Sequence, residues 1–207
     1  MFIPKTFAMT DKETQHKFIK EFGFGIVIAN THSLSATHLP FVLEAEQGDH
    51  GVLYAHCAKA NPLWKNLQDQ EVLVIFTGPH SYISPSLYTN APAVPTWNYT
   101  AVHAYGTASL LDSTDTLKAV DQVVAQYEPQ LLEKRDIVTE DITQKLLSGI
   151  VGIKIEIKKL EGKLKLGQNK NNQDQAKVFE ALSCSKNLDD QALAKYMQQI
   201  KVGIGQS

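Results

Sequence analysis

The sequence predicts an α+β protein that is mainly β: an antiparallel barrel with peripheral helices and a helical pair at its C-terminal end. Two observations carry this prediction. Short apolar stretches follow one another with few polar residues between them, as in antiparallel sheets. Residues 149–158 alternate isoleucine with charged side chains, as in a strand with one wet face. Five or six such strands with short connections favour a closed or nearly closed barrel over an open sheet.

The first part of the chain predicts one helix and three strands. Residues 10–13 (TDKE) have the pattern of a capping box with Thr10 as N-cap, which predicts a helix over 11–22 that ends at Gly23. Strands are predicted at 24–29, 36–43 and 51–56, with polar turns at 30–35 and 46–50. Three short strands joined by tight turns predict an antiparallel meander.

The middle of the chain predicts a short helix and two more strands. Asn61 followed by Pro62 predicts an N-cap and a first helical residue, with the helix reaching about Gln68. Strands are predicted at 72–76 and 101–111. The stretch 78–106 lies between these two strands and overlaps the start of the second. It contains four prolines, which predict a long loop. We expect this loop to be ordered, because its aromatic content exceeds that of disordered segments.

The last part of the chain is mainly helical. A helix capped at Asp112 is predicted to run through Tyr127, followed by a charged linker at 129–140 and a short helix at 141–148. After the strand at 149–158, two helices are predicted at about 173–182 and 189–199. We therefore predict a barrel domain over 1–169 and a C-terminal helical appendage over 170–207 that packs on the barrel.

The composition narrows the class of protein. The chain has 207 residues, of which 43% are hydrophobic and 20% charged, as in ordinary globular domains. The net charge of −2 gives no overall basic field for nucleic acid, although it leaves room for a local basic patch. The two cysteines form no C-x-x-C pair, and no apolar run is long enough to span a membrane. These features predict a soluble, cytoplasmic protein without a membrane partner.

The stretch 78–106 is also a candidate ligand site. Its rings (Tyr82, Tyr88, Trp97 and Tyr99) are interleaved with small polar side chains, which suits a pocket for a planar ligand. Packing of the loop onto its own core explains the same residues equally well. No glycine-rich phosphate loop, serine-hydrolase motif or metal-ligand spacing is present in the sequence, so a nucleotide would have to be held in another way.

Residues 56–62 (HCAKANP) offer such a way. Lys59 is basic, His56 can donate a hydrogen bond, and Asn61 begins a predicted helix. Together these features suit a phosphate group. The alternative is a solvated lysine in an ordinary turn.

Seven segments, taken together, carry a resemblance to a known family. In chain order they are 2–5 (FIPK), 37–41 (THLPF), 56–64 (HCAKANPLW), 74–88 (VIFTGPHSYISPSLY), 94–99 (VPTWNY), 102–106 (VHAYG) and 160–169 (LEGKLKLGQN). They resemble the PaiB family, the FMN-binding negative transcriptional regulators of bacteria, over nearly the whole chain. The resemblance implies a split-barrel flavin-binding fold, FMN as cofactor, and a homodimer whose site is shared between subunits.

The resemblance also implies cofactor-binding residues. By analogy with split-barrel flavoproteins, Thr37, His38 and Leu39 would present strand backbone to the isoalloxazine ring. His56 and Lys59 would face the phosphate, next to Asn61. Further carry-overs are Trp97, Asn98, Lys165 and Gln168. No catalytic residue and no metal ligand is assigned. Leu164 stands where the family's run has an aromatic residue, and the missing ring would weaken ligand stacking.

Three functions follow from these expectations. The first is an FMN-binding, PaiB-like negative regulator of transcription, with direct or indirect DNA contact. No helix-turn-helix is evident, and the C-terminal helices resemble a packing pair more than a recognition element. The second is a flavin-dependent oxidoreductase of the split-barrel class with an unknown small substrate. The third is an interaction protein that keeps the barrel without the cofactor.

Overall fold

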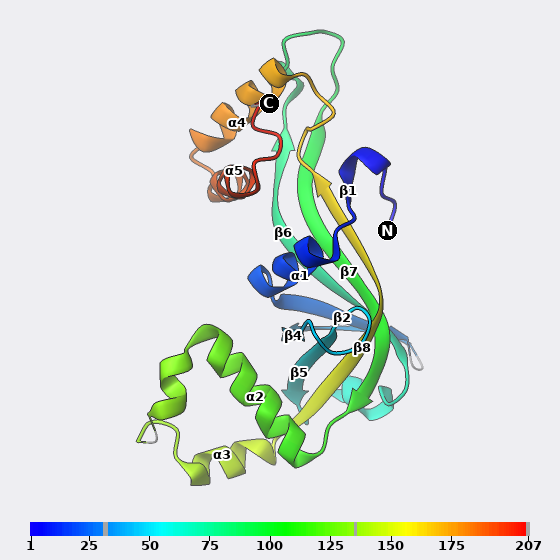
Figure 1. The fold of residues 1–207 in the computed structure, drawn as a ribbon, viewed down its shortest axis with the longest axis vertical. Coiled ribbons are helices and arrows are strands. Elements are labelled where there is room, and N and C mark those ends of the chain that lie inside the picture. The colour runs from blue at the N-terminus through cyan, green and yellow to red at the C-terminus, as the bar shows by residue number, and fades with distance from the viewer. Residues whose placement is uncertain (31–32, 135, 206–207) are drawn as a thin grey trace. The chain divides into compact units, whose positions relative to one another are not determined.

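The computed structural model describes residues 1–30, 33–134 and 136–205 (Figure 1). Its α-helices are α1 (Lys12–Glu21), α2 (Ser113–Tyr127), α3 (Glu140–Leu147), α4 (Asn172–Ser183) and α5 (Leu188–Ile200). Its strands are β1 (Ala8–Met9), β2 (Phe24–Asn30), β3 (Leu34–Pro40), β4 (Val42–Glu44), β5 (Val52–Ala58), β6 (Glu71–Ile83), β7 (Thr96–Leu110) and β8 (Ile150–Lys165). Short 3-10 helices are η1 (Lys5–Phe7), η2 (Pro62–Asn66), η3 (Pro85–Leu87) and η4 (Pro129–Glu133). The predicted turn at 30–35 lies partly outside the described residues.

The strands form one sheet in the order β3-β2-β6-β7-β8-β5-β4, and β1 pairs with β8 beside this path. Each pairing with a defined register is antiparallel. Strand β3, at one end of the order, also contacts β5 near the other end, so the sheet curls towards a barrel. It does not close within the described residues. The mainly β fold with peripheral helices is therefore confirmed, whereas complete closure of the barrel is not.

The chain divides into two compact units, which we describe separately. The terminal unit comprises Met1–Thr10, Thr77–Val102 and Glu161–Ser207, and the internal unit comprises Asp11–Phe76 and His103–Leu160. Strands β6, β7 and β8 contribute residues to both units. The predicted domain boundary at residue 169 stays a prediction.

The internal unit is built around the alternating strand that the sequence predicted. Ile153, Ile155 and Ile157 of β8 are at most 2% exposed. Leu53 and Ala55 of β5 lie opposite Ile155 and Ile153 and are fully buried. Alternate residues of a strand point to opposite faces, so the charged residues between the isoleucines face outwards. Helix α2, which is capped as predicted by Asp112, contacts β4 and β5.

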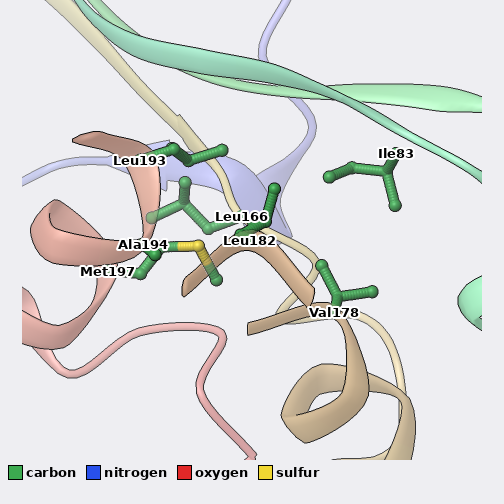
Figure 2. Packing of buried hydrophobic residues seen from close by; sticks show 7 residues of the cluster. All are labelled: Ile83, Leu166, Val178, Leu182, Leu193, Ala194 and Met197. Atoms are coloured by element: carbon green, nitrogen blue, oxygen red, sulfur yellow. The ribbon is translucent and has the colours of Figure 1, made fainter. Parts of the chain in front are cut away.

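The terminal unit has a core of its own, shown in Figure 2. It joins α4 and α5 to β6 and to the end of β8 through seven buried side chains: Ile83, Leu166, Val178, Leu182, Leu193, Ala194 and Met197. Polar bonds reinforce this packing. Asp174 accepts hydrogen bonds from Thr89 N at 2.7 Å and Thr89 Oγ1 at 2.6 Å, and Ser81 Oγ donates to Asp190. The predicted C-terminal helices are confirmed as a packed pair.

Two predictions for the first part of the chain are wrong in detail. Helix α1 is capped by Asp11, whose carboxylate accepts from Thr14 N at 2.7 Å, and not by Thr10. The strand predicted over 36–43 breaks into β3 and β4, because Phe41 N leaves the ladder to donate to Gly23 O at 2.8 Å. As a result β3 pairs with β2 and β4 pairs with β5, each antiparallel as predicted, but the meander is interrupted at Phe41.

The predicted loop over 78–106 is much shorter in the structure. Strand β6 continues through Pro79 to Ile83, and β7 already begins at Thr96. Proline lacks an N–H donor, but its carbonyl still accepts, and Pro79 O receives a bond from Thr100 Oγ1 at 3.4 Å. Much of the aromatic segment therefore lies on rigid strands.

Candidate functional site

Thr37 and Asn61 meet at one corner of the internal unit. Thr37 lies in β3, and Asn61 is the N-cap of η2, as predicted. Asn61 Nδ2 donates to Thr37 Oγ1 at 3.1 Å, while Asn61 Oδ1 accepts from Leu63 N at 3.0 Å. Asn61 therefore ties η2 to β3. Because Leu63 N is already bonded, this short 3-10 helix does not leave that N–H for a phosphate.

Lys59 supplies the positive charge at this corner, which we call the Lys59 corner and define by Thr37, Lys59 and Asn61. Its backbone is fixed, since Lys59 N donates to Gly149 O at 2.8 Å and Lys59 O accepts from Trp64 Nε1 at 2.9 Å. The side chain is exposed, and Nζ donates to Ser148 O at 3.1 Å. In the described chain no carboxylate pairs with Lys59. Its ammonium is therefore anchored at the base and available to an anion.

Strand β3 presents an open edge beside this corner. In the described residues it pairs only with β2, so its other edge carries backbone groups that no neighbouring strand satisfies. Leu39 is buried, and His38 lies on the opposite face, with its ring stacked at 26° on Phe24 and 5.9 Å between centroids. The His38 side chain is thus engaged on the outer face of the sheet, and only the backbone of residues 37–39 is offered at the edge.

His56 lies on the face of β5 that α2 covers. Its register partner is Gly152, and a Cβ at Gly152 would lie 2.4 Å from Thr116 Oγ1 of α2. Directly opposed residues share a face, so His56 lies on the side of β5 against which α2 packs. Its Nδ1 is buried and has no hydrogen-bond partner in the described chain, and burial lowers the pKa of the imidazole. His56 is therefore neutral near pH 7, with one nitrogen unused.

The other predicted residues belong to the terminal unit. Gln168 is fully committed to the backbone, because Oε1 accepts from Leu166 N at 2.8 Å and Nε2 donates to Leu164 O at 2.6 Å. Asn98 is only 2% exposed. Leu164 packs against the hydrophobic cluster of this unit, so an apolar side chain without a ring suits that position.

Trp97 and Lys165 lie next to each other, with Trp97 exposed and Lys165 half-buried. Trp97 is 52% exposed, and its ring lies near those of His80 and Tyr82. Lys165 Nζ donates to Trp97 O at 2.8 Å and to Thr96 Oγ1. The structure thus brings Thr37, Lys59 and Asn61 together in one unit and Trp97 and Lys165 together in the other.

Sequence reasoning missed Lys163. It is 7% exposed, and its ammonium lies 4.9 Å from the centroid of the Tyr99 ring. The one signal in the sequence was that Lys163 and Lys165 are two residues apart at the end of a strand, where they share a face. The neighbouring strand that supplies the ring could not be identified from spacing.

Among residues 1–30, 33–134 and 136–205, no three His, Cys, Asp or Glu side chains gather as a metal ion would need. Within the same residues, none of the helices is long and apolar enough to cross a bilayer.

The curled, open antiparallel sheet with peripheral helices is the architecture of a split-barrel protein. A family model described as "Putative FMN-binding domain" matches residues 1–159. The chain belongs to this family. The match spans both units in part and includes the whole Lys59 corner.

Similar proteins agree with this assignment. The protein named "Protease synthase and sporulation protein PAI 2" of Bacillus subtilis (strain 168) is 36% identical over 205 residues, which cover 96% of this chain and 97% of that protein. An uncharacterised protein of Emericella nidulans, AN0679, is 34% identical over 70% of this chain and 74% of its own length. The resemblance to the PaiB family is confirmed.

Solved structures share the fold. The flavocytochrome Anf3 of Azotobacter vinelandii superposes with a TM-score of 0.60 at 19% identity, over 76% of this chain and 69% of that one. An FAD- and haem-binding protein of Mycobacterium smegmatis gives a TM-score of 0.59 at 15% identity, over 76% and 73% of the two chains. At these identities the likeness concerns the fold alone.

The residues at the Lys59 corner fit a flavin mononucleotide. The ligand carries one phosphate, and Lys59 is an anchored cation without a carboxylate partner. The flavin ring system carries donors and acceptors along an edge, and the open edge of β3 offers both kinds of backbone group. The cofactor of this family is therefore compatible with the chain's own donor set.

Proposed function

We propose that this protein is a cytoplasmic, FMN-binding regulator of the PaiB type that acts in negative control of gene expression. The observation that carries the proposal is the FMN-binding family match over residues 1–159, which includes the anchored cation of the Lys59 corner. The Bacillus subtilis relative is named for protease synthase and sporulation, which supports a regulatory role. Both cysteines are free thiols, as expected in a reducing compartment.

Each residue of the corner has a role in this proposal. Lys59 binds the phosphate through its ammonium, a charge-assisted contact. The backbone of Thr37 and Leu39 meets the polar edge of the ring system, and Asn61 holds Thr37 in position through its amide. His56 has no role in this proposal, because its side chain lies on the face of β5 against which α2 packs and its Nδ1 is buried there. When bound, FMN supplies one- and two-electron redox chemistry.

The test is the visible absorption of the purified protein before and after addition of FMN and removal of the excess. We expect flavin bands in the wild type. In Lys59→Ala the affinity for FMN should fall by roughly 10- to 150-fold, because a hydrogen bond to a charged group contributes about 1.5–3 kcal/mol. Lys65→Ala is the matched control, since Lys65 is an exposed lysine of η2. A wild-type protein that never retains FMN contradicts the cofactor proposal.

We also propose a homodimer formed through the outer face of the sheet in the internal unit. Ile26 and Ile28 of β2 lie directly opposite Ile75 and Leu73 of β6, and all four are only partly buried. Leu34 at the rim of this face is 77% exposed. A continuous apolar sheet face of this kind favours association. The mass in solution tests it: Leu34→Glu should weaken the dimer, whereas Leu188→Glu, at an equally exposed leucine of α5, should not.

Regulation through a partner or through the flavin's redox state is favoured over direct DNA recognition. Helices α4 and α5 bury Val178, Leu182, Leu193 and Met197 in the core of the terminal unit, as a packing pair does. Retardation of DNA by the FMN-loaded protein, specific to one sequence, would contradict this view. Steady oxidation of a reduced nicotinamide by the same protein would favour the alternative function, a flavin-dependent oxidoreductase.

A further inference from the structure

Strand β6 has two different faces within the terminal unit. Ser81 and Ile83 are buried on the side of α4 and α5, where Ser81 bonds Asp190. Alternate residues point to the other side, so His80 and Tyr82 face away from these helices and are exposed. The helical pair therefore covers one face of the strand and leaves the other open.

The open face carries a cluster of rings. Trp97 of β7 lies 6.1 Å from Tyr82 at 73° and 6.1 Å from His80 at 37°, measured between ring centroids. Trp97 and Tyr82 are each 52% exposed. Aromatic side chains usually bury most of their surface. His80 and Tyr82 belong to β6 and Trp97 belongs to β7, so the backbone that carries each ring is held in the sheet. An exposed indole held in this way is a surface on which a planar group can stack.

Lys163 of β8 lies beside Tyr99, which shares a face of β7 with Trp97, and Lys165 is two residues further along β8. Lys163 Nζ donates to Phe2 O at 3.1 Å and lies over the Tyr99 ring, while Lys165 Nζ donates to Trp97 O and Thr96 Oγ1. An ammonium has three donors, so each lysine keeps at least one. Neither is paired with a carboxylate in the part of the chain that the structure describes. Burial and the like charge of Lys163 lower the pKa of Lys165.

These contacts leave a positive charge that is partly desolvated and already held in place. Binding an anion there would cost little side-chain entropy, because hydrogen bonds fix both amines beforehand. It would also relieve the repulsion between the two ammonium groups. The site thus combines a flat apolar surface with a cation pair at its edge.

We propose that this surface, the Trp97 face (His80, Tyr82, Trp97, Tyr99, Lys163 and Lys165), binds a small planar anion, an aromatic ring bearing one phosphate or carboxylate. The ring stacks on Trp97, and the anionic group accepts from Lys165 and Lys163. Two lysines suit a single anionic group, whereas a nucleic-acid strand requires several phosphate contacts. The inference rests on the proposed function in one respect: FMN is taken to bind at the Lys59 corner. Trp97 and Lys165 are then assigned to the planar anion and not to FMN.

Adenosine monophosphate is a suitable probe, because adenosine lacks its charge and inorganic phosphate lacks its ring. Calorimetric titration of the wild type should show saturable binding of adenosine monophosphate and at least tenfold weaker binding of the other two. Lys165→Met and Trp97→Ala should each weaken it by tenfold or more. Lys170→Met removes another cation over a ring of this unit, near Tyr88, and should leave binding unchanged. Equal binding of adenosine, or indifference to Lys165→Met, would overturn the proposal.

The chain's two tryptophans help to locate the probe. Trp64 belongs to η2 of the internal unit and Trp97 to the terminal unit, so in Trp64→Phe the fluorescence comes from Trp97 alone. Adenosine monophosphate should quench that emission with the calorimetric affinity. Unchanged Trp97 emission at saturation would place the probe elsewhere and refute the assignment.

FMN separates this inference from the proposed function. If the two sites are distinct, saturating FMN leaves the affinity for adenosine monophosphate unchanged, and Lys59→Ala loses FMN while keeping the probe. Competition between the two ligands would show that the Trp97 face is part of the flavin site, and the second site would be refuted. If the protein retains no FMN but binds the probe through Lys165, the proposed function fails and this inference stands.

Discussion

Replacing Gly106 with alanine should destabilise the internal unit by about 1–3 kcal/mol, the usual range for overpacking a well-packed core. A Cβ at Gly106 of β7 would lie 2.4 Å from Glu156 O and 2.8 Å from Ile155 Cγ2 of β8. Ordinary carbon contacts begin roughly 1 Å further out. The nearest atom is backbone of a neighbouring strand, so no side-chain rotation can relieve the clash, and the two strands would have to separate locally.

The assay is thermal unfolding followed by circular dichroism, with Gly149→Ala as control. A Cβ at Gly149 meets nothing closer than Leu146 O at 3.4 Å, so that variant should unfold within about 2 °C of the wild type. For a chain of this size each kcal/mol corresponds to roughly 2–4 °C, so Gly106→Ala should lower Tm by roughly 2–12 °C. If both variants unfold at the wild-type temperature, the close approach of β7 and β8 at Gly106 does not exist.

Three further predictions concern the core and its titrating groups. Leu193→Ala removes a fully buried side chain and should cost about 2–5 kcal/mol by urea unfolding, with Leu188→Ala, at an exposed position, close to neutral. Hydrogen bonds from Thr89 lower the pKa of Asp174, so the ionised carboxylate stabilises the fold above the ordinary aspartate pKa, and this stabilisation is lost as pH falls through the lowered value. Asp174→Asn should reduce this acid-induced loss of stability. An unchanged dependence of stability on pH in that variant would contradict the stabilising role of Asp174. Burial lowers the pKa of His56, so below the ordinary histidine pKa the unfolded chain takes up a proton that the folded chain does not, and the folded state loses stability. In His56→Phe, the fall of Tm with decreasing pH in this range should be smaller.

The local signals in the sequence predicted the elements well where a single residue decides the backbone. Asp112 caps α2 and Asn61 caps η2, because each side-chain oxygen accepts a hydrogen bond from a nearby backbone N–H. The alternation of Ile153, Ile155 and Ile157 predicted the buried face of β8, because every second residue of a strand points to the same face.

What the sequence could not supply was the partner of each strand and side chain. The prolines of residues 78–106 predicted a loop that begins at Gly78, yet β6 continues through Pro79 to Ile83. The break at Phe41 depends on a bond to Gly23 O, which only the folded chain brings near. In the site, Lys59 and Asn61 were found from their spacing, whereas Lys163 needed the ring of Tyr99 from another strand.

The division of the chain into interleaved segments has a consequence for synthesis. All residues of the internal unit precede residue 161, so they have been translated before the last segment of the terminal unit. Ile83 is made early, but its buried partners Leu193 and Met197 are made late. On the ribosome, the apolar side of β6 in the terminal unit therefore stays exposed until α4 and α5 have been made, and a chaperone or another nascent chain can bind it. A translation stop between residues 161 and 190 should leave chains with a finished internal unit and an aggregation-prone remainder.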